Sequence, residues 1–174
     1  MRIFIIILLA LSLSACGFHL RGHNLKGKGL PFKIVYVKAA ASTPFVADLR
    51  SNLELYKIEL SATPAEADLT LEIVSETSNK VILAISGAGQ VREFQLSYRV
   101  SMRAYDNQKR EWLQADEISL QRTLIYDDAQ VLAREQEEAL LNRDMRADAV
   151  QQVMRRLSRA KPQPDEVSKP VQVQ

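Results

Sequence analysis

The chain has 174 residues and a net charge of +2 at pH 7, with 47% hydrophobic and 6% aromatic residues. A charge so near neutral gives no general electrostatic reason to bind nucleic acid. The length fits a short leader followed by one domain with its own hydrophobic core, and no apolar run after the leader is long enough to span a membrane.

The N-terminal segment has the features of a secretory signal. One cation, Arg2, precedes an unbroken apolar run from Ile3 to Leu11, which is too short for a spanning helix. The run Leu13-Ser14-Ala15-Cys16 then resembles the lipobox of bacterial lipoproteins. This resemblance implies that residues 1–15 are a signal peptide cleaved before Cys16. It also implies an N-acyl group and an S-diacylglycerol lipid on Cys16.

The cysteine content favours lipidation over an ordinary signal peptide that happens to precede a cysteine. Cys16 is the only cysteine in the chain, and an unpaired thiol has no partner in an oxidising compartment. Several acyl chains on one residue anchor a protein stably, whereas a single chain holds it only marginally. Gly17 follows where the inner-membrane retention signal typically has aspartate, so we expect the outer membrane.

The mature chain divides into three predicted parts. Residues 16–31 include Gly22, Gly27 and Gly29 and are expected to form a flexible, lipidated tether. Residues 32–159 are the predicted folded domain. Residues 160–174 contain three prolines among polar residues, and we expect this tail to be disordered.

The first elements of the domain are a strand and a helix. Residues 33–38 are β-branched and aromatic and predict a short buried strand. Thr43 and Pro44 predict the start of a helix, with threonine as the N-cap and proline at the first helical position. Its predicted apolar stripe consists of Phe45, Leu49, Leu53 and Tyr56. A loop around residues 61–67 follows.

The next sixty residues predict three long antiparallel strands. Apolar residues occupy odd positions from Leu69 to Ile85 and even positions from Phe94 to Met102, and this alternation constrains the pairing. A two-residue turn at Ala88-Gly89 would connect the first two strands. It would place Leu83 opposite Phe94 and Val81 opposite Leu96.

The third strand keeps even parity after a turn at residues 106–110. The predicted pairs are Leu96 with Leu120, Tyr98 with Ile118, and Ala104 with Trp112. Arg122 falls on the apolar parity, which indicates a bulge or the end of burial.

A long helix over residues 129–158, capped by Asp127 or Asp128, completes the domain. Its apolar stripe steps by four through Leu141, Met145, Ala149, Val153 and Leu157. Two helices, each with one apolar stripe, and a sheet with one apolar face predict a two-layer α+β fold. We expect both helices to pack on one face of a mostly antiparallel four-stranded sheet.

No motif predicts catalysis or a cofactor other than the lipid on Cys16. His19 and His23 have the spacing of a helical metal pair, but glycines make that segment a poor helix and no further ligand lies nearby. Gly87-Ala88-Gly89 lacks the third glycine of a nucleotide loop and favours a hairpin turn. We therefore predict no catalytic residue, no metal site and no enzymatic activity.

The mature N-terminus resembles that of the LPS-assembly lipoprotein LptE (RlpB) family. The run Cys16-Gly17-Phe18-His19-Leu20-Arg21 matches that family's Cys-Gly-[Phe/Trp]-His-Leu-Arg/Lys pattern. The later order agrees too, with Gly89-Gln90 after the first hairpin strand, a long charged helix and a polar tail. The resemblance covers essentially the whole chain, although outside the leader it is one of pattern more than of identity.

This resemblance implies a cell outer-membrane lipoprotein that plugs the lumen of the β-barrel LptD from the periplasmic side. It also implies help in barrel assembly and in delivering lipopolysaccharide (LPS) to the outer leaflet. A lipoprotein chaperone or lipid carrier that works alone would need an enclosed apolar cavity, for which the chain has no surplus of apolar residues. A periplasmic hydrolase would need a nucleophile and base that the sequence lacks.

Arginines are the candidate binding residues, since LPS carries phosphates and acidic sugars that suit bidentate guanidinium donors. The reversal of each strand places Arg92 and Arg134 at one end of the meander, with Lys80 further down. Arg92 and Arg134 are our predicted LPS contacts. Arg99 and Arg103, on the polar face, are predicted to face the barrel or to make secondary LPS contacts.

Overall fold

The computed structural model describes residues 30–127 and 130–163. The signal peptide, Cys16, the two histidines and residues 17–29 of the predicted tether lie outside the described residues, as do residues 164–174. The last part of the predicted tether belongs to the domain, because Leu30 is partly buried against the core. The described elements follow one another in this order: β1 (Ile34–Ala39), α2 (Pro44–Leu55), β2 (Glu59–Leu60), a short 3-10 helix (Pro64–Glu66), β3 (Leu69–Ile85), β4 (Val91–Tyr105), β5 (Glu111–Ile125) and α3 (Val131–Leu157).

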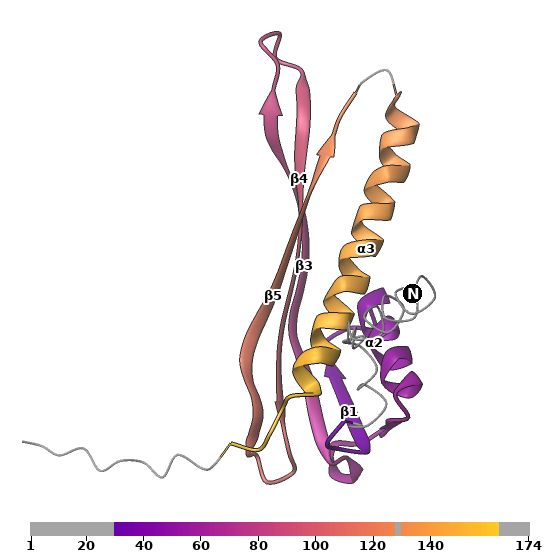
Figure 1. Ribbon diagram of the computed structural model, residues 1–174, viewed down its shortest axis with the longest axis vertical. Coiled ribbons are helices and arrows are strands. Elements are labelled where there is room, and N and C mark those ends of the chain that lie inside the picture. Colours follow the sequence, from indigo (N-terminus) through magenta and orange to yellow (C-terminus); the bar gives the residue numbers. More distant parts are fainter. Residues whose placement is uncertain (1–29, 128–129, 164–174) are drawn as a thin grey trace, which may run out of the picture.

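The fold is two-layer α+β, with α2 and α3 on one face of a single sheet (Figure 1). The strand order is β2-β1-β3-β4-β5. The expectation of four strands was wrong: β2 pairs in parallel with β1, and β1 pairs in parallel with β3, so the sheet is mixed and five-stranded. At two residues, β2 is too short to produce a recognisable alternation in the sequence.

Helix α2 begins as predicted. The Val46 N–H donates to Thr43 Oγ1 over 3.3 Å, and Pro44 occupies the first turn, where no N–H is needed. Phe45, Leu49 and Leu53 are fully buried. Tyr56 is instead largely exposed, because the helix ends at Leu55 and Tyr56 is its C-cap.

The pairing of β3 with β4 differs from the predicted register. Phe94 lies opposite Ile82 and Leu96 opposite Lys80. The cause is an irregularity between Ile73 and Ser75, which leaves Val74 unpaired and exposed. An extra residue in one strand exchanges the two faces of everything beyond it. Odd residues of β3 therefore face the core before Val74, and even residues share the core-side face after it.

The hairpin turn also contains one residue more than predicted. The Gly89 N–H donates to the Ser86 carbonyl over 2.9 Å, and the Ser86 N–H donates to the Gln90 carbonyl over 2.7 Å. Gly89 has a φ of 78°, which glycine adopts without steric cost. The turn is thus a three-residue loop that ends in a left-handed glycine.

Strands β4 and β5 have the predicted parity but are displaced by two residues. Tyr98 lies opposite Leu120 and Val100 opposite Ile118, and two irregularities near the connecting turn place Leu113 opposite Ala104. Arg122 lies opposite Leu96, at neither a bulge nor the end of burial, since Leu124 beyond it is fully buried. Its guanidinium reaches α3 and forms an ion pair with Asp148 at 2.7 Å.

Helix α3 begins later than predicted, with Gln130 at the N-cap in place of Asp127 or Asp128. The predicted stripe is confirmed in its C-terminal part, where Met145, Ala149, Val153 and Leu157 are fully buried. Leu141 is only partly buried. The helix therefore packs into the core through its second half, while its first half runs beside the far ends of the strands (Figure 1).

The ordered domain extends slightly past the predicted boundary at residue 159. Ala160 is buried, and the Gln163 N–H donates to the Glu111 carbonyl over 2.8 Å. The start of the predicted tail therefore packs against β5. Among the described residues, the buried core runs from Phe32 to Ala160.

Two truncations should separate the packed residues from the rest of the tail. A chain that ends after Gln163 should keep the thermal midpoint of the full chain, because the residues removed are polar and proline-rich. A chain that ends after Arg159 should lose about 1–2 kcal/mol, or a few degrees, with the buried Ala160 and the Gln163 bond. Differential scanning calorimetry measures both, and a large fall for the longer chain would contradict the predicted tail.

Candidate functional site

The candidate site is the end of the molecule where the β3–β4 turn and the start of α3 meet (Figure 1). We call this end the tip. Arg92, next to the first residue of β4, and Arg134, in the first turn of α3, both belong to it. The Tyr126 N–H donates to the Arg92 carbonyl over 2.8 Å, which joins the end of β5 to the start of β4. The structure thus places the two arginines at one end, as strand reversal requires.

An ion pair and aromatic contacts hold α3 against the strands just below the tip. Lys80 Nζ lies 2.6 Å from Glu138 Oε2 and 4.3 Å from the centre of the Phe94 ring. The Phe94 ring meets Tyr126 edge-on at 5.3 Å. Lys80 is on the α3 side because of the Val74 irregularity, so the sequence analysis could not foresee its partner. Lys80 therefore has a structural role, because it holds α3 against the strands.

Arg134 is also held by α3 itself. Its Nη1 lies 2.6 Å from Glu137 Oε2, whereas its buried Nε has no hydrogen-bond partner in the described part of the chain. Because Nε is buried, an anionic ligand could contact this guanidinium only through its outer Nη groups. Arg92, in contrast, is exposed and forms no ion pair with any described residue. Of the two predicted contacts, Arg92 is the more available cation.

The two arginines of the open sheet face, which α2 and α3 leave uncovered, have different surroundings. Arg99 is exposed between Thr77 and Ser119 and has no ion pair among residues 30–127 and 130–163. Arg103 lies in a cross-strand row with Glu72 and Lys38, and both cations approach Glu72 to 2.8 Å. Hydrogen bonds from Lys38 and then Arg103 lower the pKa of Glu72. Arg103 is therefore occupied within the protein, unlike Arg99.

Neutral polar side chains line the middle of the open face. Gln95 Nε2 donates to Gln121 Oε1 over 3.3 Å across β4 and β5, and Ser97 lies between Asn79 and Gln121. Such a surface can exchange hydrogen bonds with a polar partner. The polar residues at odd positions of β4 predicted this character, and the structure extends it to both neighbouring strands.

A partly buried carboxylate lies where α2 meets the sheet. The Tyr98 hydroxyl donates to Glu76 Oε1 over 2.6 Å, and the Thr43 hydroxyl donates to Glu76 Oε2. Burial, followed by this hydrogen bond, raises the pKa of Tyr98. Both glutamate oxygens are therefore satisfied, as buried polar groups require. The sequence pattern did not reveal this role of Glu76. Without the extra residue at Val74, its even position would place it on the open face.

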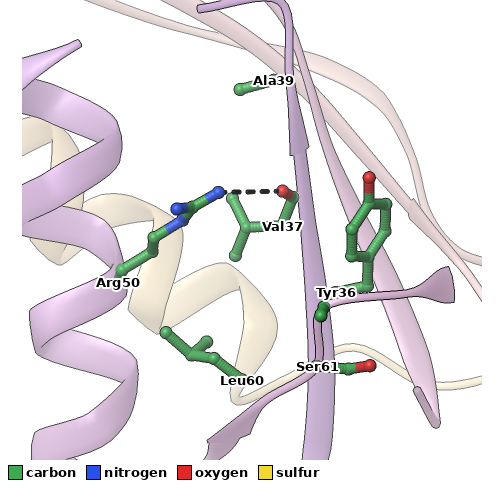
Figure 2. A pocket seen from close by; sticks show the side chains of 7 residues that line it. Tyr36, Val37, Ala39, Arg50, Leu60 and Ser61 are labelled. Carbon is green, nitrogen blue, oxygen red and sulfur yellow. Dashed lines mark hydrogen bonds between the residues drawn. The ribbon is translucent and has the colours of Figure 1, made fainter. Parts of the chain in front are cut away.

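A small pocket of about 380 Å³ lies at the outer edge of β1, between α2 and β2. Figure 2 shows Arg50 reaching from α2 towards the Val37 carbonyl, with Leu60 and Ser61 below it in this view. The Arg50 Nη2 donates to that carbonyl over 3.5 Å. Strand β2 covers only Ile34 and Val35, so Arg50 protects the edge beyond it, as charged side chains do at sheet edges.

The described residues show no arrangement for metal chemistry. No group of three histidine, cysteine or carboxylate side chains comes together within them. Among the same residues, no helix has both the length and the apolar character needed to cross a membrane.

A protein-family comparison matches most of this architecture. The model of the family described as LptE, lipopolysaccharide-assembly, matches residues 32–157. The chain belongs to the LptE family. This confirms the resemblance inferred from the N-terminal motif, although the matched region begins after that motif.

Individual relatives agree with this assignment. The LPS-assembly lipoprotein LptE of Yersinia enterocolitica is 28% identical over 149 residues, which cover 83% of this chain and 69% of that protein. The solution structure of lipoprotein B from Nitrosomonas europaea is 38% identical, with a TM-score of 0.70 over 82% of this chain and 90% of that chain. A minor lipoprotein of Acinetobacter baumannii is 25% identical, with a TM-score of 0.63 over 78% and 99% of the respective chains. The LptE family is described by lipopolysaccharide assembly and not by a catalysed reaction.

Proposed function

We propose that this protein is an outer-membrane lipoprotein that plugs the barrel LptD and binds LPS at its tip. The acylated Cys16 would anchor it, and the domain would lie on the periplasmic side within the barrel lumen. There it would assist barrel assembly and the delivery of LPS to the outer leaflet.

The polar open face supports the plug role. An outer-membrane barrel of channel size has a polar lumen, so a plug needs a surface that is polar without being strongly charged. The face around Gln95, Ser97 and Gln121 has this character over three long strands. A carrier that works alone would need an enclosed apolar cavity, and the pocket beside Arg50 is too small and too polar to hold several acyl chains.

The exposed guanidinium of Arg92 is the observation that carries LPS binding. It lies at the tip and forms no ion pair with an acid among residues 30–127 and 130–163, beside a helix start that contributes Arg134. Acidic groups of LPS could pair with Arg92 directly and with the outer Nη groups of Arg134.

Arg92→Ala combined with Arg134→Ala should weaken LPS binding by about tenfold. A charge-assisted hydrogen bond contributes roughly 1.5–3 kcal/mol, and solvent screening at these partly exposed sites reduces that figure. The loss should shrink at high salt, because screening weakens the wild-type contacts first. Titration of the domain with LPS at low and high salt measures this effect.

Arg155→Ala is the matched control, since Arg155 is exposed in the last turn of α3, at the end opposite the tip, and forms no ion pair with a described residue. It should leave LPS affinity unchanged, and both the double variant and the control should still co-purify with the barrel in a one-to-one complex. Unchanged LPS affinity of the double variant at low salt would refute the tip as the binding site. Failure of the wild-type protein to co-purify with LptD would refute the plug.

A further inference from the structure

Large apolar side chains exposed in the described part of the chain gather at the tip. Of eleven such residues, seven belong to the ends of β3 and β5 and the start of α3. Five of them lie on the strands and are between 49% and 63% exposed. We call these five the tip patch: Val81, Ile82, Leu83, Ile85 and Ile125. Clustered exposed apolar side chains of this kind mark interaction sites in soluble domains.

The irregularities of β3 create this patch. Because of the extra residue at Val74, Val81 lies opposite Gln95 on the open face and not against α3. Ile125, opposite Glu93, shares that face, whereas Ile82, opposite Phe94, lies on the α3 side. Ile85 lies on the α3 side too, because its neighbour Ala84 pairs with Glu93 and so shares the open face. Leu83 sits at a second irregularity between Ile82 and Ala84. The patch therefore wraps around both faces of the sheet at its narrow end.

The charges beside the patch indicate what covers it. Arg92 is exposed within the same hairpin and is the available cation there, whereas Lys80 and Arg134 are each paired with a glutamate of α3. A ligand that combines an apolar portion with anionic groups matches both features at once. Flexible acyl chains can also follow a convex surface that wraps around a sheet end, which a rigid flat partner cannot.

We propose that the tip patch binds the acyl chains of LPS while Arg92 binds its acidic headgroup. This inference rests on the proposed function and adds a second, apolar subsite to the arginine contacts. It makes acyl chains, and not the headgroup alone, part of what the protein recognises.

The test compares LPS with fully deacylated LPS, which keeps the acidic groups and lacks the chains. The variant Leu83→Ser combined with Ile85→Ser is titrated in the anchor-free chain of residues 17–174. It should bind LPS at least about tenfold more weakly, because apolar burial is lost, and should bind deacylated LPS like the wild type. The control variant, Leu55→Ser combined with Leu140→Ser, alters exposed leucines outside the tip and should bind both like the wild type.

Each other outcome overturns the inference. Unchanged LPS affinity of the tip variant would exclude acyl contact, and an equal loss for both ligands would assign the patch to the headgroup. Loss of barrel co-purification with unchanged LPS affinity would make the patch a protein contact. If the wild type binds neither form of LPS, the proposed LPS-binding function itself fails, which is a distinguishable result. Circular dichroism confirms that both variants are folded.

Discussion

Cys16→Ala is expected to abolish the incorporation of labelled palmitate and to leave the protein unprocessed or released from the membrane. The thioether to diacylglycerol requires a cysteine sulfur, and the chain has no other cysteine. The domain should still fold, because its described core is built from residues between Phe32 and Ala160. Metabolic labelling followed by membrane fractionation measures the result.

A neighbouring substitution provides the control. Gly17→Asp should keep the palmitate label and shift the protein towards the inner membrane, because aspartate at this position is typical of the retention signal. Palmitate found on the Cys16→Ala protein would disprove the lipobox interpretation. Unchanged sorting of labelled Gly17→Asp would remove the argument for the outer membrane while leaving lipidation intact.

The sequence predicted the helices and strands better than the register in which the strands pair. The cap at Thr43, the stripe from Phe45 to Leu53 and the burial of α3 from Met145 onward follow from local patterns, which the fold preserves. The β3–β4 register failed because a single unpaired residue, Val74, exchanges the faces of the strand beyond it. Nothing in the alternation around Val74 marks it as extra, since apolar residues occupy odd positions on both sides of it.

For the candidate site, likewise, the sequence predicted the location of the residues better than their contacts. The location of Arg92 and Arg134 at one end required only that successive strands reverse, and this held. The partners of the arginines depend on strand register and on side-chain rotamers, which the sequence pattern does not reveal. Arg103 could not be separated from Arg99 without knowing that Lys38, Glu72 and Arg103 form one row across three strands. The apolar tip patch was missed because Val81, Leu83 and Ile85 were assigned to the core.

Phe45→Ala should destabilise the domain by about 3–5 kcal/mol, the usual cost of removing a fully buried phenylalanine. Phe45 is completely inaccessible and packs against Tyr98, with ring centres 6.4 Å apart, where α2 meets the sheet. Phe94→Ala should cost about 1–2 kcal/mol, because Phe94 is only partly buried near the tip and its neighbours can relax into the space. Urea unfolding measured by circular dichroism gives both values.

The ratio of these two losses in the free energy of unfolding tests whether stability is concentrated at the end opposite the tip. Nearly all fully buried side chains lie at the end formed by β1, α2 and the second half of α3, so folding free energy should be concentrated there. The tip is then free to expose apolar side chains and Arg92 to a ligand without loss of the fold. A Phe94→Ala cost equal to that of Phe45→Ala would show that the tip is part of the cooperative core, and a surface so committed to folding would be a poor candidate for binding LPS.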